Sequence, residues 1–187
     1  MDIRRTSKGP FKVGILPIDG FALMSYSCCV EPLRAANLLA QRTLFDIVHL
    51  GLDPVVQSSG TAVVEPCIHP RLKPELDMLL LIAGGDPLRF VDDALFQWLR
   101  QVARSSLTLG GVSGGPVILA KAGVMNGYRM TVHWEHAAGL TEMHPELTVE
   151  KRLYVFDRDR VTCGGGTAPL DLMHDLIGQQ HGGAFAR

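Results

Sequence analysis

The heptapeptide DMLLLIA, residues 77–83, is the segment of the sequence that decides the fold. After Asp77 it runs apolar without interruption and then stops at Gly84-Gly85-Asp86-Pro87, a sequence typical of a turn. Successive side chains of a strand point to opposite faces of the sheet, so a strand that is apolar throughout must be covered on both faces. Residues 77–83 therefore predict a central strand of a parallel sheet.

Strands and helices alternate on both sides of this segment. The other predicted strands are Phe11–Pro17, Leu44–Leu50, Thr61–Val64, Leu107–Val112, Arg129–Val132 and a hairpin of Leu153–Phe156 with Arg160–Cys163. The predicted helices are Phe21–Ala40, Asp92–Ser105, Val117–Ala122, Trp134–Met143 and a last helix that follows Gly164-Gly165-Gly166. Such alternation favours an α/β sandwich with a mostly parallel sheet.

The first and last helices carry specific expectations about their buried faces. In the last helix, we expect Leu170, Met173, Leu176 and Ile177 to form the buried stripe. The first helix places Leu23, Tyr26, Val30, Leu33, Asn37 and Ala40 at helical spacing. Pro32 inside this stretch predicts either a kink or a helix that begins near Glu31.

Length and charge exclude several classes of protein. The 187 residues suffice for one domain with a sizeable core, and residues 1–10 are expected to be a disordered or loosely held tail. With 18 Lys and Arg against 19 Asp and Glu, the net charge is -1, which argues against DNA binding by this chain alone. The first ten residues lead into no apolar stretch of signal-peptide or membrane length, so we expect a cytoplasmic protein without a membrane partner.

The four cysteines, Cys28, Cys29, Cys67 and Cys163, show no spacing typical of a metal site. Reduced thiols packed in the core are expected rather than disulfides. His133 and His136 are three residues apart but lack a third ligand nearby. We therefore predict neither a metal nor an organic cofactor.

The segment GGVSGGP, residues 110–116, is the candidate for chemistry. Residues 111–115 match G-x-S-x-G, in which a strand turns sharply into a helix and exposes the serine, here Ser113, at the turn. The N–H groups and dipole at the start of the following helix favour an anion there. A serine-dependent hydrolase is one interpretation of this pattern.

Three segments in this order, AGGDP (83–87), GVSGGP (111–116) and TVHW (131–134), resemble the class I glutamine amidotransferase-like superfamily. Its three-layer, flavodoxin-like fold includes intracellular cysteine peptidases and deglycase-like proteins. The resemblance implies that Ser113 stands in the place of the elbow cysteine, His133 in that of the histidine beside it, and Gly85 in that of the oxyanion-hole residue. A serine hydroxyl has a far higher pKa than a thiol, so we expect a vestigial elbow and no enzymatic activity.

A finer resemblance is to the N-terminal sensor domain of AraC/XylS-type transcriptional regulators, over residues 11 to 185. It is carried by DGFAL (19–23), VEPLRAAN (30–37), residues 122–127, TVHW (131–134) and residues 164–171. The resemblance implies that residues 11–187 form the sensor domain and that a helix-turn-helix domain lies beyond it. It also implies a homodimer, because paired DNA half-sites mirror the symmetry of the protein.

The expected effector is a small carboxylate with an ammonium group, such as a betaine-like or amino-acid-like metabolite. The residues expected to bind it are Ser113, Gly114, Gly85, His133, Trp134, Glu31, Phe21 and Tyr26. The helix start after Ser113 would hold the anionic end, and the aromatic rings the cationic end. Relatives with the same signatures include regulators of betaine, carnitine and arginine metabolism.

Other interpretations of these residues stay open at this stage. The aromatic rings are equally explained as core residues, and Glu31 as a carboxylate at the start of a helix. Alternatively, Glu31 faces Ser113 from below the elbow, as the resemblance implies, or Glu135 orients His133. The chain as a whole is interpreted as an effector-binding regulatory domain. The alternatives are a serine-dependent hydrolase or deglycase-like enzyme and a purely structural dimerisation module.

Overall fold

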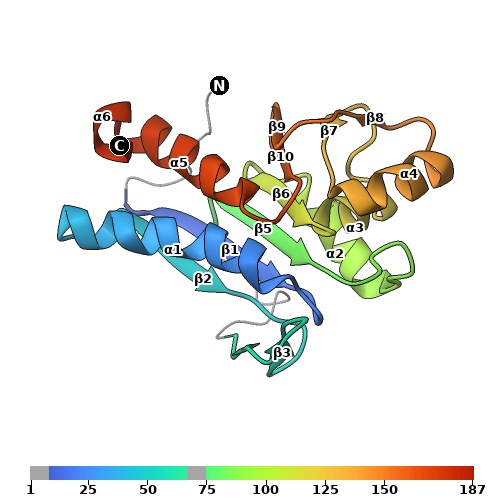
Figure 1. Ribbon diagram of the computed structural model, residues 1–187, viewed down its shortest axis with the longest axis horizontal. Helices are drawn as coiled ribbons and strands as arrows, with labels where there is room; N and C mark the ends of the chain where they lie inside the picture. The colour runs from blue at the N-terminus through green and yellow to red at the C-terminus, as the bar shows by residue number, and fades with distance from the viewer. Residues whose placement is uncertain (1–8, 67–74) are drawn as a thin grey trace.

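The computed structural model describes residues 9–66 and 75–187 and shows three layers, with helices on each face of a central sheet (Figure 1). The six-stranded sheet has the order β2-β1-β5-β6-β10-β9. Every neighbouring pair is parallel except β10 and β9, which are antiparallel. The predicted α/β, flavodoxin-like sandwich with a mostly parallel sheet is confirmed.

The strands of the main sheet are β1 (Phe11–Pro17), β2 (Phe45–His49), β5 (Met78–Ala83), β6 (Thr108–Ser113), β9 (Tyr154–Asp157) and β10 (Arg160–Cys163). Two further strand pairs lie outside it, β3 (Val56–Gln57) with β4 (Val63–Val64) and β7 (Arg129–Met130) with β8 (Thr148–Val149). The helices are α1 (Leu23–Ala40), α2 (Asp93–Val102), α3 (Gly115–Lys121), α4 (Trp134–Met143), α5 (Ala168–His181) and α6 (Gly183–Ala186).

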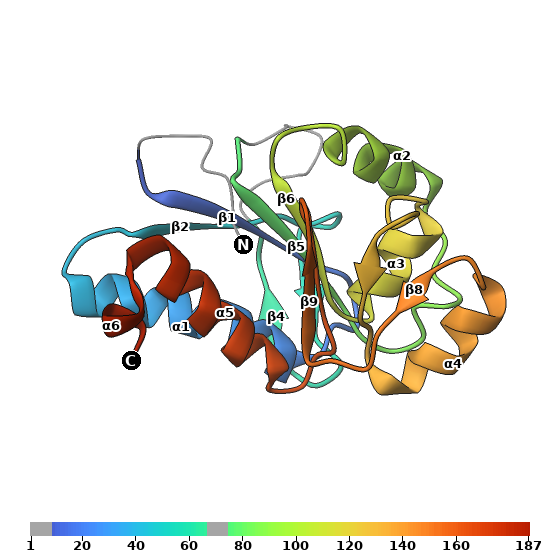
Figure 2. The same cartoon turned by 90° about the horizontal axis from the view of Figure 1, so that it is seen from above.

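Strand β5 lies at the centre of the sheet and is buried along its whole length. Its side chains alternate between two hydrophobic clusters. Met78, Leu80 and Ile82 pack with α1 and α5 on one face of the sheet, whereas Leu79 and Leu81 pack with α2 and α3 on the other. Figure 2 shows these helix pairs on opposite sides of the sheet. Coverage on both faces is what the uninterrupted apolar run predicted.

Helix α1 begins at Leu23 and continues through Pro32, which excludes one of the two predicted alternatives, a start near Glu31. Its buried residues are Ser25, Cys29, Leu33 and Ala36, and of these only Leu33 belongs to the set noted at helical spacing in the sequence. These residues form a stripe of helical spacing that packs with α5 and the sheet. Burial along the whole stripe outweighs the roughly 3 kcal/mol that a proline costs inside a helix.

The last helix differs from its prediction at a single position. Leu170 is half exposed, while Met173, Leu176 and Ile177 are buried as expected. Leu172 takes the place of Leu170 on the buried face. The hairpin of β9 and β10 before this helix is confirmed, with Arg160 paired to Asp157.

The cysteines within the described residues are free thiols. Cys29 and Cys163 are buried and Cys28 is partly buried. Burial raises the pKa of the Cys29 thiol well above its usual range and that of Cys163 to about 12, so both stay protonated and unreactive. Cys67 and most of the predicted tail, residues 1–8, lie outside the described residues.

The contact between α3 and β5 gives a prediction about stability. A Cβ atom added at Gly115 would lie 2.0 Å from the backbone oxygen of Leu81, so Gly115→Ala is expected to lower the free energy of unfolding by about 1–3 kcal/mol. Gly183 has open space around an added Cβ atom, and Gly183→Ala is the matched control. Urea unfolding of both variants measures the difference, and equal stabilities would contradict the close approach.

Candidate functional site

The candidate site is built on the turn from β6 into α3. Strand β6 ends at Ser113, which has a φ of +60°, and α3 begins at Gly115. Left-handed backbone at a residue with a Cβ atom costs on the order of 1–3 kcal/mol and is retained where the surroundings enforce it. Ser113 is only 5% exposed. The predicted sharp turn from strand to helix at Ser113 is confirmed, whereas the predicted exposure of the serine is wrong.

The backbone donors at the elbow are partly occupied. The N–H of Gly114 donates to the carbonyl of Ala83 at 3.0 Å, so it is not free for an anion as the sequence suggested. This bond ties the elbow to the end of β5, where Ala83 is already paired with Ser113 in the parallel register. Gly85 follows directly, exposed and with a φ of +61°. The structure therefore places Ser113 and Gly114 beside Ala83 at the carboxyl ends of β5 and β6, with Gly85 two residues after Ala83 in the chain.

His133 approaches the elbow through its backbone. Its N–H donates to the carbonyl of Ser113 at 3.3 Å. Its Nδ1 atom is buried without a hydrogen bond, 3.4 Å from a carboxylate oxygen of Glu135 and outside hydrogen-bond geometry. Within residues 9–66 and 75–187, neither ring nitrogen of His133 hydrogen-bonds the Ser113 hydroxyl. The pair of nucleophile and base that a serine hydrolase uses is thus not assembled here.

A serine of α1, which the sequence analysis did not single out, supports the elbow from the other side. Ser25 is fully buried, and its hydroxyl accepts a hydrogen bond from the N–H of Gly166 at 2.9 Å. The adjacent Gly165 lies directly against the elbow, since a Cβ atom there would be 2.6 Å from the Cβ atom of Ser113. Ser25 thereby holds residues 164–166 against Ser113. The signal in the sequence is a polar residue in register with Cys29 and Leu33.

Glu31 does not face Ser113, and this prediction is wrong. Its side chain is exposed and pairs with Arg34 one turn along α1, at 2.7 Å. The hydrogen bond from Arg34 lowers the pKa of this carboxyl. Because α1 begins at Leu23, Glu31 is not at a helix start either. It lies about 120° around the helix from Ser25, at 100° per residue, and so on a different face.

The three candidate aromatic residues do not form one cage. Phe21 is fully buried, with its ring 5.2 Å from that of Tyr26, whose hydroxyl lies 2.7 Å from Nε2 of His49. Trp134 is 77% exposed and contacts the ring of His133 at 5.6 Å. In the described part of the chain, no ring contact joins Trp134 to Phe21 or Tyr26. Phe21 is a core residue, and only Trp134 is accessible beside the elbow.

The described residues contain no group of three or more His, Cys, Asp or Glu side chains that could hold a metal ion. His133 and His136 have ring centroids 5.7 Å apart. Burial, and then the neighbouring His133, lower the pKa of His136.

Comparison with known proteins gives a consistent result. The sequence profile of the DJ-1/PfpI family matches residues 11–179. The HTH-type transcriptional regulator CdhR of Pseudomonas aeruginosa is 42% identical over 173 residues, which cover 91% of this chain and 51% of that protein. The HTH-type transcriptional regulator GlxA of Rhizobium meliloti is 42% identical over 185 residues, covering 97% and 56%. The chain thus spans about half the length of these curated relatives.

A solved structure agrees with these relatives. The crystal structure of an AraC family transcriptional regulator from Pseudomonas putida superposes with a TM-score of 0.84 at 26% identity. The superposition covers 95% of this chain and 96% of that one. The fold of this chain is therefore shared with a regulator of transcription.

The buried histidine beside the site gives a prediction about pH. The pKa of His136 is lower in the folded chain than in the unfolded one, where it is about 6.5. Between these values the unfolded chain binds more protons, so the stability contribution of His136 is full above about pH 7 and is lost as the pH falls through that window.

His49, whose pKa is also lowered by burial, acts in the same sense. We therefore expect His136→Gln to remove only part of the pH dependence. Urea unfolding of both proteins from about pH 5 to pH 8, the range in which histidine titrates, measures the two slopes. Identical slopes would show that His136 is not buried in its neutral form.

Proposed function

This chain belongs to the DJ-1/PfpI family, and from that premise we propose that it is the effector-sensing domain of a transcriptional regulator. The observation that carries the proposal is that two relatives at 42% identity are HTH-type regulators of which the chain covers 51% and 56%. In this proposal residues 11–187 sense a small molecule, and a helix-turn-helix domain of the whole protein binds DNA. The net charge of -1 suits a domain that leaves DNA contacts to another part of the protein.

The geometry of the elbow offers a route by which an effector acts. Gly165 lies against Ser113, and residues 164–166 lead directly into α5, the long helix before the C-terminal end (Figure 1). Helix α5 packs along α1, whose Ser25 holds the same segment. A ligand that displaces Gly165 would therefore shift α5 relative to α1. Such a shift is a physical means of signalling to a domain that follows.

The alternative is a serine-dependent hydrolase or deglycase-like enzyme, and the positive φ of Ser113 is the observation in its favour. Against it stand the hydroxyl in place of a thiol and, among the described residues, the lack of a hydrogen bond from the His133 ring to the Ser113 hydroxyl. We propose that the elbow is vestigial. Turnover of generic ester, amide or glyoxal-adduct substrates that disappears in Ser113→Ala would establish the enzyme instead.

For the effector itself, we propose a small carboxylate that also carries an ammonium group. Ser113, Gly85, His133 and Trp134 remain the candidate contacts at the edge of the sheet, whereas Gly114 has its N–H occupied. The exposed ring of Trp134 is available to a cation, and the nearby Glu135 carboxylate supplies charge complementarity. Phe21, Tyr26 and Glu31 contribute no contacts in this form of the proposal.

We further propose a homodimer that acts in the cytoplasm. Helix α1 exposes four large apolar side chains, Leu23, Met24, Leu38 and Leu39, and the segment of β3 and β4 exposes Val55 and Val63. Exposed apolar side chains that gather on one element favour an interface. None of the helices in the described residues is long and apolar enough to span a bilayer.

The proposed effector gives a prediction about ligand binding. Calorimetry with carboxylates, betaines and neutral isosteres is expected to detect binding of a betaine-like or amino-acid-like molecule. Trp134→Ala is expected to weaken it by about thirtyfold, since a desolvated cation over such a ring gains about 2 kcal/mol and each step of about 1.4 kcal/mol is tenfold in affinity. Met143→Ala, an exposed residue at the far end of the same helix, is the control. Tight binding of a neutral sugar or an aromatic hydrocarbon, unchanged in Trp134→Ala, would refute this ligand class.

The proposed homodimer gives a prediction about the mass of the chain in solution. Sedimentation is expected to give a dimer mass for the chain at micromolar concentration and a monomer mass for the double variant Leu38→Glu, Leu39→Glu, because buried charges oppose association. Val63→Glu places a charge on the other candidate surface and is expected to leave the dimer intact. A monomer mass for the unmodified chain, independent of concentration, would contradict the proposal.

A further inference from the structure

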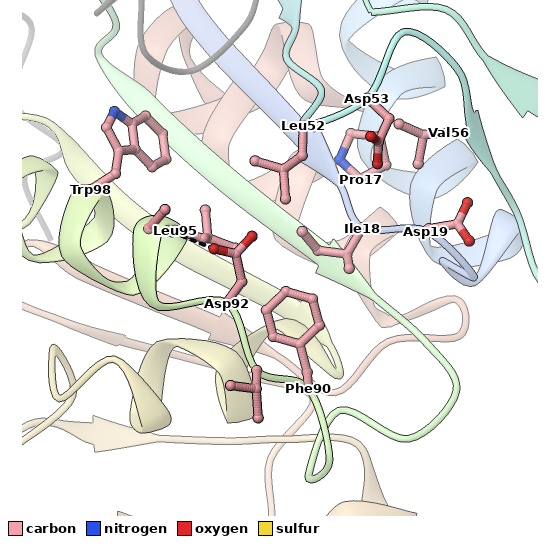
Figure 3. A pocket seen from close by; sticks show the side chains of 12 residues that line it. Pro17, Ile18, Asp19, Leu52, Asp53, Val56, Phe90, Asp92, Leu95 and Trp98 are labelled. Carbon is pink, nitrogen blue, oxygen red and sulfur yellow. Dashed lines mark hydrogen bonds between the residues drawn. The ribbon is translucent and has the colours of Figure 1, made fainter.

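A cavity of about 370 Å³ lies at the carboxyl end of β1, separate from the elbow (Figure 3). Its walls are residues 17–19 at the end of β1, parts of segment 52–56, and parts of segment 90–98 at the start of α2. No residue of the elbow lines it. In the sheet, β1 lies between β2 and β5, so the strand that follows β1 in the chain pairs with one of its edges and the later strand β5 pairs with the other. This is the point of an open α/β sheet at which ligands usually bind.

The interior of this cavity is apolar. Ile18, Val56 and Leu95 are almost fully buried and belong to the two hydrophobic clusters. Phe90 and Trp98 line it from the side of α2 and are partly buried (Figure 3). A volume near 370 Å³ falls in the range of about 300–1,000 Å³ that small-molecule sites occupy. The cavity therefore suits the apolar body of a small ligand.

The wall that carries Phe90 is fastened to the fold. The ammonium group of Lys121, at the end of α3, donates hydrogen bonds to the backbone oxygens of Leu88 and Phe90, the latter at 2.6 Å. Asp92 caps α2 by accepting from the N–H of Leu95 at 2.8 Å. Hydrogen bonds within the protein thus hold this segment both before and after Phe90. The cavity is preformed, which lowers the entropic cost of binding.

All charged residues that line the cavity are acidic, namely Asp19, Asp53 and Asp92. One oxygen of Asp19 accepts from the N–H of Gln57 at 2.9 Å, and one of Asp92 from Leu95, which fixes the direction of both carboxylates. Within the described residues, none of the three forms an ion pair with a cationic side chain. Asp19 and Asp53 are exposed and Asp92 is partly buried, so a ligand can reach all three carboxylates.

We propose that this cavity binds an organic ammonium cation with an apolar body, at a second site that goes beyond the effector site at Ser113. The apolar body fills the space between Leu52, Leu95 and Trp98, and the ammonium group pairs with Asp53 and Asp92. The faces of Phe90 and Trp98 attract the same charge. A zwitterion such as a betaine would bring its carboxylate close to these aspartates. The site therefore selects amines that lack a carboxylate.

The test compares four probes of similar size by calorimetry on the 187-residue chain: 2-phenylethylammonium, 2-phenylethanol, 3-phenylpropionate and glycine betaine. Saturable binding of 2-phenylethylammonium is expected, with each other probe at least about tenfold weaker, a difference of about 1.4 kcal/mol. Equal binding of the alcohol or the carboxylate would overturn the proposal, as would no binding of the ammonium probe at millimolar concentration.

Substitutions locate the binding. Asp53→Asn and Asp92→Asn are each expected to weaken binding of 2-phenylethylammonium about fivefold or more, and asparagine preserves the helix cap at position 92. Asp93→Asn removes the same charge from an exposed neighbour outside the cavity and is the matched control. If Asp93→Asn weakened binding as much as Asp92→Asn, the probe would be attracted by the negative charge of this region in general and not by a contact in the cavity. That result would overturn the proposal.

Two further measurements separate this site from the effector site. Ser113→Ala is expected to leave binding of 2-phenylethylammonium unchanged, because Ser113 does not line the cavity. The proposed cavity site can therefore be correct even if the proposed effector site at Ser113 is not. Trp98 and Trp134 are the two tryptophans of the chain, and in Trp134→Phe the fluorescence of Trp98 reports on binding away from the elbow. Because Trp98 also borders a pocket with Leu76 and Leu107, the aspartate variants above assign the change to the cavity. A saturable change of that fluorescence with the ammonium probe is expected. A change seen only when Trp134 is present would place the probe at the elbow and refute the second site.

Discussion

Burial of β5 on both faces is the constraint on which the rest of the structure depends. Its side chains alternate between two hydrophobic clusters, so helices must cover the sheet on both sides. Helix α3 packs so close to this strand that a glycine at position 115 is required beside the backbone oxygen of Leu81. The same strand ends at Ala83, whose carbonyl accepts from Gly114. Core packing and elbow geometry therefore come from one strand.

The strain at Ser113 is retained because segments distant in the sequence hold it. Residues 164–166 lie against the elbow, and the buried hydroxyl of Ser25 in α1 holds them there. His133 adds a backbone bond but no side-chain partner for the Ser113 hydroxyl. The contacts that hold the elbow in this conformation do not include a catalytic partner for Ser113 among the described residues. In the proposed sensing mechanism, a ligand at the elbow shifts α5 relative to α1, the two helices whose contacts maintain this shape.

The aromatic and acidic side chains are distributed differently from what the sequence predicted. The aromatic residues proposed for a cation divide between the core, where Phe21 lies, and the surface, where Trp134 lies. Three carboxylates and two other aromatic rings meet instead at the end of β1. The two regions are connected through the backbone, because residues 84–90 run from the end of β5, where Ala83 contacts the elbow, to the cavity wall. A fold shared with regulators thus leaves room for two different ligand chemistries.

The sequence by itself determined the order of the elements, the parallel sheet and the position of the elbow. Apolar runs such as residues 77–83 and glycines around Ser113 act through local backbone geometry and burial, which a linear pattern records. The pattern could not show the rotation of α1 about its own axis, which turns Ser25 inward and leaves Glu31 in solvent. It also could not show that Asp19, Asp53 and Asp92 share one cavity. Both depend on how separate segments pack together, and only the tertiary structure decides that, because packing joins residues that are far apart in the chain.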